Sequence, residues 1–357
     1  MVRATVTGTG AALPPVTEQQ LLWDRYFSDH FAGSRIARRV FSEAGVRRRH
    51  TVVDPLVEDP SGWSTGRRMR RYAQEAPALA HRAAEAALAD AGLAAEELGL
   101  LTVASCTGYS TPGLDIGLAA SLGLRPDTQR LLVGHMGCFA ALPALGSTAD
   151  FVAARGRPAL LVCVELTSLH VQPPTRDPQQ VVSHALFSDA AAALVVQPPA
   201  VDLGGLELVD IAALTDSGSS GHMTWDVTDL GFRMGLSPRV PEVLAKHVRP
   251  VTEELLARHG LDIPDVRSWA VHPGGPRILD TVEEQLALPP EALAASRAVL
   301  AEHGNCSSPT VLLVLREVVR RPGPGEAPAP GTPVVAMAFG PGLTLYAALF
   351  RVRPGAG

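Results

Sequence analysis

Residues 130–145 (RLLVGHMGCFAALPAL) join a Val- and Leu-rich run to an Ala-rich run through a turn that ends at Cys138. The first run predicts a buried strand, and the second a helix that begins at or just after Cys138. A thiol at a helix N-terminus meets the positive end of the macrodipole and unpaired backbone N–H groups. We therefore expect a lowered pKa for Cys138 and a thiolate nucleophile. A buried structural cysteine is the alternative.

Strand-like and helix-like segments alternate on both sides of this turn. Apolar runs predict strands at residues 98–104, 130–133, 159–164, 191–196, 268–271, 333–339 and 343–352. Amphipathic runs predict helices at residues 69–91, 139–154, 276–288 and 307–321. The Pro- and Gly-rich residues 321–333 predict an exposed loop. The order of elements indicates an α/β fold and a weak duplication, with halves at residues 1–200 and 201–357.

Composition excludes several classes of function. The 357 residues carry a formal net charge of -5, which disfavours nucleic-acid binding. Four scattered cysteines offer neither a disulfide framework nor a zinc motif, so we expect no metal site. No signal peptide and no run of 18 apolar residues is present, so no membrane association is expected. We expect a cytoplasmic protein.

A histidine follows one of the predicted strands. His272 lies in residues 269–279 (WAVHPGGPRIL), where a Pro- and Gly-rich turn leads into a predicted helix. An imidazole exposed at a strand tip can point into a cleft and accept a thiol proton or donate to a thioester carbonyl. A core histidine with satisfied ring nitrogens is the alternative.

Two further segments carry groups suited to a reactive site. Asn305 lies in residues 302–310 (EHGNCSSPT), before a long apolar helix, where its amide is suited to stabilise an enolate or oxyanion. A turn former or helix cap is the alternative for this residue. Gly340-Pro341-Gly342 forms a rigid backbone corner that can approach a ligand closely, or a plain hairpin turn.

Together these motifs resemble the chalcone synthase-like (type III polyketide synthase) family, in its bacterial type. The likeness extends from about Arg39 to Thr344 and covers GCFA at Cys138, HPGGPRIL at His272, HGNCSS at Asn305 and FGPGLT near the C-terminus. Residues 105–115 (SCTGYSTPGLD) and 185–195 (ALFSDAAAALV) match the same family.

The resemblance implies a fold and a reaction. The fold is the thiolase fold, a duplicated five-layered αβαβα sandwich that works as a homodimer. Cys138 is implied to carry the starter acyl group and the growing chain. His272 and Asn305 are implied to bind malonyl-CoA, promote its decarboxylation and stabilise the enolate that attacks the acyl group. The product is then cyclised to a pyrone, a resorcinol or a related aromatic. Acyl-CoA and malonyl-CoA are the substrates, with no metal, other cofactor or acyl carrier protein required.

The resemblance also implies residues that line the site. Phe187 matches a gatekeeper of the coenzyme A tunnel, and Met234 replaces a second gatekeeper that is phenylalanine in plant enzymes. Thr111 matches a residue that reaches into the partner's cavity. Further cavity positions are Cys106, Thr107, Thr167, His170, Trp225, Ser307, Gly340, Pro341 and Gly342, and the position of Trp225 rests on a gapped match.

The coenzyme A contacts follow the family less closely. Arg35, Arg39, Gly274 and Arg277 are implied to hold coenzyme A, although Ile36 and Glu43 replace two family lysines. The run at residues 47–50 (RRRH) is typical of a solvated face or a structural arginine cluster.

Two other functions share these features. A ketoacyl synthase of fatty acid synthesis uses the same Cys–His–Asn set and takes malonyl groups from acyl carrier protein. The Pro–Gly pairs beside His272 and the Gly-Pro-Gly corner disfavour it. A catalytically inactive thiolase-fold binding protein is disfavoured because Cys138, His272 and Asn305 are all present.

Overall fold

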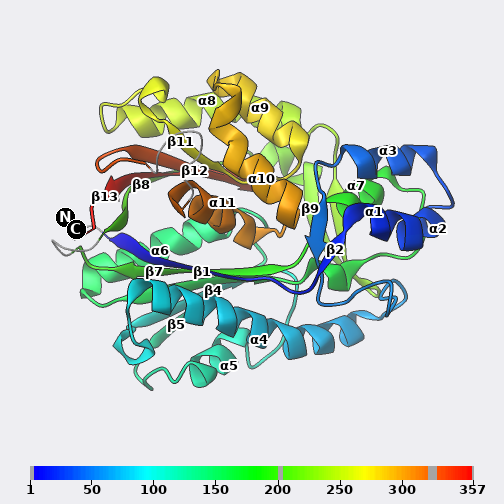
Figure 1. Cartoon of the computed structure of the whole chain (residues 1–357), viewed down its shortest axis with the longest axis horizontal. Coiled ribbons are helices and arrows are strands. Elements are labelled where there is room, and N and C mark those ends of the chain that lie inside the picture. Colours follow the sequence, from blue (N-terminus) through cyan, green and yellow to red (C-terminus); the bar gives the residue numbers. More distant parts are fainter. Residues whose placement is uncertain (1–3, 200–203, 321–327, 356–357) are drawn as a thin grey trace.

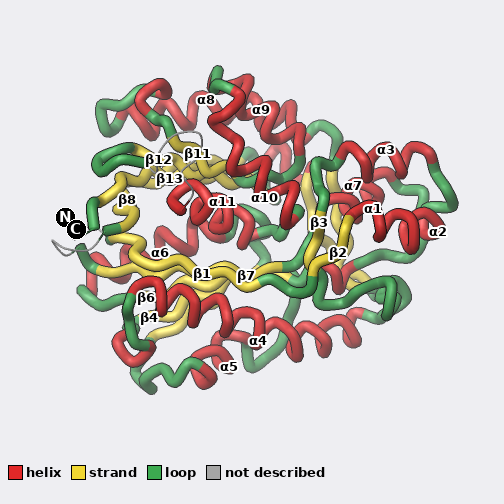
Figure 2. The backbone as a smooth tube through the Cα atoms, viewed as in Figure 1, coloured by secondary structure: helices red, strands yellow, loops and turns green. Residues whose placement is uncertain are grey.

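The computed structural model describes residues 4–199, 204–320 and 328–355. Within them, one mixed sheet of nine strands has the order β11-β12-β13-β8-β1-β7-β6-β4-β5 (Figure 2). These strands are β1 (Thr5–Ala12), β4 (Leu100–Ser105), β5 (Gln129–Gly134), β6 (Ala159–Glu165), β7 (Ala190–Gln197), β8 (Gly205–Thr215), β11 (Ser268–Val271), β12 (Pro333–Gly340) and β13 (Thr344–Arg353). Among the described residues, β1 and β8 pair through Thr5 with Glu207 and Val6 with Leu206, and this pairing joins the two parts of the sheet.

Helices cover and separate the two parts of the sheet (Figure 1). One outer layer holds α8 (Val240–Ala257) and α9 (Pro276–Leu286), and the other holds α4 (Thr65–Ala91) and α5 (Leu114–Ser121). α6 (Ala141–Arg155) and α11 (Ser308–Arg320) fill the middle layer. Three apolar clusters occupy the spaces between layers. This is the five-layered αβαβα arrangement that the resemblance implied.

Smaller elements gather at the end of the molecule away from both termini (Figure 1). They are α1 (Gln19–Leu22), α2 (Ser28–His30), α3 (Arg35–Glu43), α7 (Pro178–Leu186), the β2 (Val16–Glu18)–β3 (Arg48–His50) pair and the β9 (Met223–Thr228)–β10 (Gly231–Leu236) hairpin. α10 (Ala294–His303) leads from the α8–α9 layer into the middle layer. An aromatic cluster that includes Trp23, Phe27, Phe31 and Phe41 is the core of this end.

The predicted elements correspond to strands and helices of the structure, with shifted ends. α4 begins at Thr65 rather than at residue 69, because the Ser64 side chain accepts the Arg67 N–H and caps the helix. The predicted loop at 321–333 lies mostly outside the described residues, and the division near residue 200 stays a prediction. Within the described ranges, no helix combines the length and apolar composition that a membrane span requires.

Candidate active site

Cys138 lies in the turn between β5 and α6, in the middle layer of the sandwich. α6 starts at Ala141, so the thiol precedes the first helical residue by three positions. The side chain is buried, and it faces a small cavity. The prediction of a strand, a turn and a helix around the cysteine is confirmed.

The expected direction of the Cys138 pKa is wrong for the ligand-free protein. Burial raises the pKa of Cys138 to about 11, and the charge of Glu165 acts in the same direction. Hydrogen bonding from the Ser307 and Asn305 side chains partly opposes this increase. Desolvation exceeds the helix effect because the cavity is shielded from water, so the thiol needs a proton acceptor to become a nucleophile.

His272 is buried rather than exposed at its strand tip. It follows β11 directly, and its N–H donates to the Met337 carbonyl of β12 at 2.8 Å. Neither ring nitrogen has a hydrogen-bond partner within the described residues, so the imidazole is not a satisfied core histidine. Burial lowers the pKa of His272 to about 3, which keeps the ring neutral at pH 7.

Asn305 has an amide of fixed orientation. Its Oδ1 accepts the Ser307 N–H at 2.8 Å, and its Nδ2 donates to the Gly274 carbonyl at 3.4 Å. Its backbone pairs with residues 186–188, since the Asn305 N–H donates to the Leu186 carbonyl and the Ser188 N–H donates to the Asn305 carbonyl. The turn role and the donor role of this residue therefore coexist, because the turn takes the oxygen, Gly274 takes one amide N–H, and the second amide N–H is left for the site.

The Gly340-Pro341-Gly342 corner is both a hairpin turn and a wall of the site. It connects β12 to β13, and Pro341 lines the cavity of Cys138. A Cβ on Gly340 would lie 2.6 Å from the Phe139 ring and 3.4 Å from the Cys138 nitrogen. Gly137 has φ +81°, and a Cβ there would lie 2.7 Å from Pro341. The corner and the nucleophile turn therefore pack too closely for larger residues.

The cavity collects most of the predicted substrate-binding residues. Cys138 shares the cavity wall with residues from several separate segments: Cys106, Thr107, Gly137, Thr167, Phe187, Trp225, Met234, Ser307 and Pro341. Trp225 therefore faces the cavity, and its indole N–H donates to the Cys106 carbonyl at 2.9 Å. Trp225 and Met234 are paired across the β9–β10 hairpin.

His170 lies outside this cavity, behind Trp225. Its Nε2 donates to the Thr107 carbonyl at 2.7 Å, and its Nδ1 accepts the Phe232 N–H at 2.9 Å. Its ring stacks on Phe232 with centroids 4.6 Å apart. Both nitrogens are occupied and burial lowers its pKa to about 3, so His170 is a neutral scaffold residue at this position.

The remaining predicted residues lie away from the cysteine. Thr111 is exposed in the loop before α5. Arg35 and Arg39 lie on the exposed face of α3, where Arg39 pairs with Glu43 at 2.9 Å, and Arg277 is exposed in the first turn of α9. Gly274 lies between His272 and Asn305, and Gly342 ends the β12–β13 corner next to Thr344. The structure thus separates the three arginine candidates for coenzyme A from the reactive groups, whereas Gly274 lies beside His272 and Asn305.

The RRRH run divides into two environments. Arg47 and Arg48 are exposed and both contact the carboxylate of Glu302. Arg49 is buried, and its Nη1 donates to the carbonyls of His184 and Phe187. The change occurs once along the run, because β3 is exposed at Arg48 and buried at Arg49 and His50.

Sequence reasoning missed Glu165. This fully buried carboxylate accepts from the Cys106 N–H at 2.9 Å, the Thr107 hydroxyl at 2.7 Å and the Ser308 hydroxyl at 2.8 Å. It joins two walls of the cavity, and burial raises its pKa. Its signal was a single acidic residue at the end of an apolar strand (ALLVCVE), where an ionisable group needs a partner or a function.

The comparisons with known proteins agree with this geometry. The family "Chalcone and stilbene synthases" matches in both parts, its N-terminal domain at residues 2–199 and its C-terminal domain at residues 212–354. The chain belongs to this family. It is a type III polyketide synthase, an acyltransferase of the condensing type, and the bacterial character of the resemblance is confirmed by its relatives. Nothing in the comparisons supports the ketoacyl synthase alternative.

Two bacterial relatives are similar over most of the chain. An alpha-pyrone synthesis polyketide synthase-like protein, Pks18 of Mycobacterium tuberculosis, is 35% identical over 88% of this chain and 81% of its own. The 1,3,6,8-tetrahydroxynaphthalene synthase of Streptomyces peucetius is 35% identical over 90% of this chain and 84% of its own.

Solved structures confirm the thiolase-like fold. PKS-I from the brown alga Ectocarpus siliculosus superposes with a TM-score of 0.90 at 28% identity, covering 99% of both chains. The C-terminal type III polyketide synthase domain of Steely1 from Dictyostelium superposes with a TM-score of 0.91 at 24% identity, covering 99% of this chain and all of that domain, a likeness of fold alone.

Proposed function

We propose that Cys138, His272 and Asn305 carry the decarboxylative condensation of this type III polyketide synthase. The supporting observation is a buried imidazole with two unpartnered nitrogens and an amide of fixed orientation, linked through Gly274. β12, the strand beside His272, ends at Gly340, where a Cβ would lie 3.4 Å from the Cys138 nitrogen. Buried polar atoms without partners are costly, so their retention here favours a functional role.

The reaction starts with loading of the starter group. His272 accepts the Cys138 proton, and the thiolate attacks the thioester carbonyl of acyl-CoA. The carbon–sulfur bond to coenzyme A breaks, and the coenzyme A thiolate takes up the proton. The acyl group is then held in the cavity below Phe187 and Trp225.

The extension step uses malonyl-CoA. Its thioester carbonyl accepts hydrogen bonds from the Asn305 amide and from His272, carbon dioxide leaves, and the negative charge is stabilised as an enolate. The enolate carbon attacks the acyl carbonyl, a carbon–carbon bond forms, and the bond to Cys138 breaks to restore the thiolate. Return of the chain to Cys138 permits another round, and cyclisation to a pyrone, resorcinol or related aromatic ends the reaction.

We propose that coenzyme A approaches from the α3–α9 side. A Cβ on Gly45, just after α3, would lie 3.1 Å from Pro276, the first residue of α9. Arg35 and Arg39 on α3 and Arg277 on α9 are therefore candidate phosphate ligands, and Gly274 leads from there to Asn305. No metal, additional cofactor or acyl carrier protein is part of this scheme. The described residues contain no cluster that could hold a metal ion.

We propose that the protein works as a cytoplasmic homodimer. β5 is an edge strand whose Leu131 and Leu132 are exposed, and Ile116 of α5 adds to the apolar surface. An exposed apolar edge strand is suited to an interface between subunits. A Cβ on Gly113 would lie 3.2 Å from Leu132, so the loop that carries Thr111 is next to this surface and can reach the partner. Four free cysteines suit a reducing compartment.

The test is replacement of the nucleophile. Cys138→Ala should abolish polyketide formation from an acyl-CoA starter and malonyl-CoA, measured by mass spectrometry. Cys163→Ala, at a buried cysteine in β6, is the matched control and should retain activity. Products formed at the wild-type rate by Cys138→Ala would refute the assignment.

A further inference from the structure

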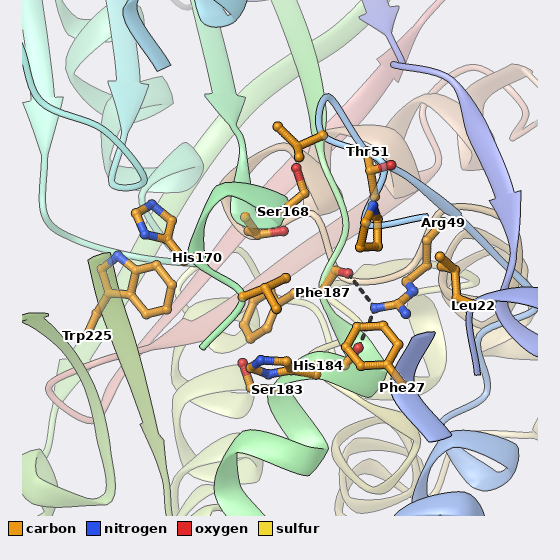
Figure 3. A pocket seen from close by; sticks show the side chains of 14 residues that line it. Leu22, Phe27, Arg49, Thr51, Ser168, His170, Ser183, His184, Phe187 and Trp225 are labelled. Carbon is orange, nitrogen blue, oxygen red and sulfur yellow. Dashed lines mark hydrogen bonds between the residues drawn. The ribbon is translucent and has the colours of Figure 1, made fainter. Parts of the chain in front are cut away.

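Arg49 is a buried guanidinium that the proposed reaction does not use. The residue is 4% exposed, and its Nη1 donates to the carbonyl of His184 and, at 3.3 Å, to that of Phe187 (Figure 3). Burial lowers the pKa of Arg49 to about 9, and the charge of Asp189 opposes this decrease, so the group stays charged at neutral pH. A buried charge is costly, which favours a role for Arg49 beyond filling space.

The two carbonyls belong to the C-terminal end of α7. The helix ends at Leu186, His184 lies in its last turn, and Phe187 is its C-cap. The last carbonyls of a helix lack intrahelical partners and carry the negative end of the macrodipole. The Arg49 cation supplies both a donor and a compensating charge there, so it fixes the place where the chain leaves α7.

The segment that leaves α7 holds the backbone of Asn305 on both sides. The Asn305 N–H donates to the Leu186 carbonyl at 2.8 Å, and the Ser188 N–H donates to the Asn305 carbonyl at 2.9 Å. Phe187 lies between these two contacts and is paired with Asn305 in an isolated parallel bridge. Arg49 therefore holds the central residue of the three that support Asn305.

The stem of Arg49 also packs beside the residue that precedes Asn305. A Cβ on Gly304 would lie 3.5 Å from the Arg49 Cγ. Cys138 belongs to a different framework, the turn between β5 and α6, which packs against Pro341. A displacement of the end of α7 would thus move Asn305 and leave the turn of Cys138 in place.

We propose that Arg49 is a positioning residue for Asn305, and that it controls the decarboxylation of malonyl-CoA more than the loading of the starter onto Cys138. The proposal rests on the proposed function, which assigns stabilisation of the enolate to Asn305. An amide donor that acts on developing charge loses much of its effect when it is displaced by about 1 Å. Loading depends on Asn305 only weakly, because Asn305 lowers the pKa of Cys138 less than Ser307 does.

Two partial reactions test the proposal. Without a starter, malonyl-CoA loses carbon dioxide and the enolate takes up a proton to give acetyl-CoA, which chromatography measures. Loading of a butyryl group onto Cys138 is measured by mass spectrometry of the intact protein. Arg49→Gln should slow decarboxylation by about tenfold or more and change loading by less than about threefold. Arg49→Lys keeps the charge and should restore part of the rate. Arg258→Gln, at an exposed arginine paired with Glu254 at 2.6 Å, is the control and should change neither reaction.

A double-mutant cycle distinguishes positioning from a general structural role. In an Asn305→Ala background, Arg49→Gln should slow the remaining decarboxylation by no more than about twofold, because the amide that it positions is gone. Thermal melting shows which variants fold, and Arg49→Lys decides the cycle if Arg49→Gln does not. An equal loss of decarboxylation and loading in folded variants, or an undiminished effect in the Asn305→Ala background, would overturn the proposal.

Failure of the proposed function gives a different result. If Asn305→Ala decarboxylates malonyl-CoA at the wild-type rate, the role of Asn305 in the condensation is wrong. If Asn305→Ala is impaired and Arg49→Gln decarboxylates malonyl-CoA like the wild type, the role of Asn305 stands and the positioning role of Arg49 is wrong.

Discussion

Replacement of His272 by alanine separates the effect of burial from the effect of the imidazole on the nucleophile. The pKa of Cys138 is raised to about 11, chiefly by burial, so about one molecule in ten thousand carries the thiolate at pH 7. His272, with a pKa lowered to about 3, is neutral at that pH and can accept the proton. Loss of this acceptor should slow alkylation of Cys138 by iodoacetamide at pH 7 by about a hundredfold or more.

The assay follows labelling against pH by peptide mass spectrometry. In both proteins the labelling rate should climb until about pH 11, and at pH 7 the wild-type rate should be about a hundredfold higher because His272 can take the proton as the sulfur reacts. Cys163, fully buried in β6, serves as an unreactive reference in the same sample. His259→Ala, at a surface histidine paired with Asp210 at 2.9 Å, is the matched control. Identical pH profiles for wild type and His272→Ala would show that the imidazole does not activate the thiol.

Two other predictions concern stability and assembly. Gly304 has φ +69°, and a Cβ there would lie 2.9 Å from the Leu186 carbonyl, so Gly304→Ala should lower the free energy of unfolding by roughly 1–3 kcal/mol in denaturant titrations. Gly260 has φ +66° and open space around it, so Gly260→Ala should lower the free energy of unfolding by less. An equal decrease in the two variants would argue against crowding at Gly304. Leu132→Asp on the β5 edge should convert a dimer to a monomer in sedimentation experiments, while Val227→Asp on the exposed face of β9 should not. A wild-type protein that sediments as a monomer would remove the dimer proposal.

The sequence predicted secondary structure best where a continuous run of neighbouring apolar residues forms a strand. β4, β6 and β7 are continuous apolar runs because both faces of the sheet are covered, and their ends were predicted to within two residues. β8 was missed, since its half-exposed, mixed sequence (GLELVDIAALT) carries no clear period. The β9–β10 hairpin was missed because it is a small exposed pair outside the main sheet.

The sequence predicted which residues form the site, but not the direction of the pKa shift of Cys138. The motifs selected Cys138, His272 and Asn305, but the sign of the Cys138 pKa change depends on burial by residues from several distant segments. The Arg49 environment depends on contacts with His184 and Phe187, more than 130 positions away in the chain. Such contacts leave no periodic signal, so the Glu165 network could not be derived from spacing.

The backbone around Phe187 has a consequence for the speed of substrate admission. Its N–H donates to Ser183, its carbonyl accepts from Arg49, and its two neighbours are bonded to Asn305. A displacement of this backbone would move Asn305 with it and disrupt the proposed binding site for the enolate. Opening must therefore come from rotation of the Phe187 ring, a motion that side chains complete far faster than a typical enzyme turnover. Passage of substrate past Phe187 is then expected to be fast, so a chemical step or product release should limit the turnover rate.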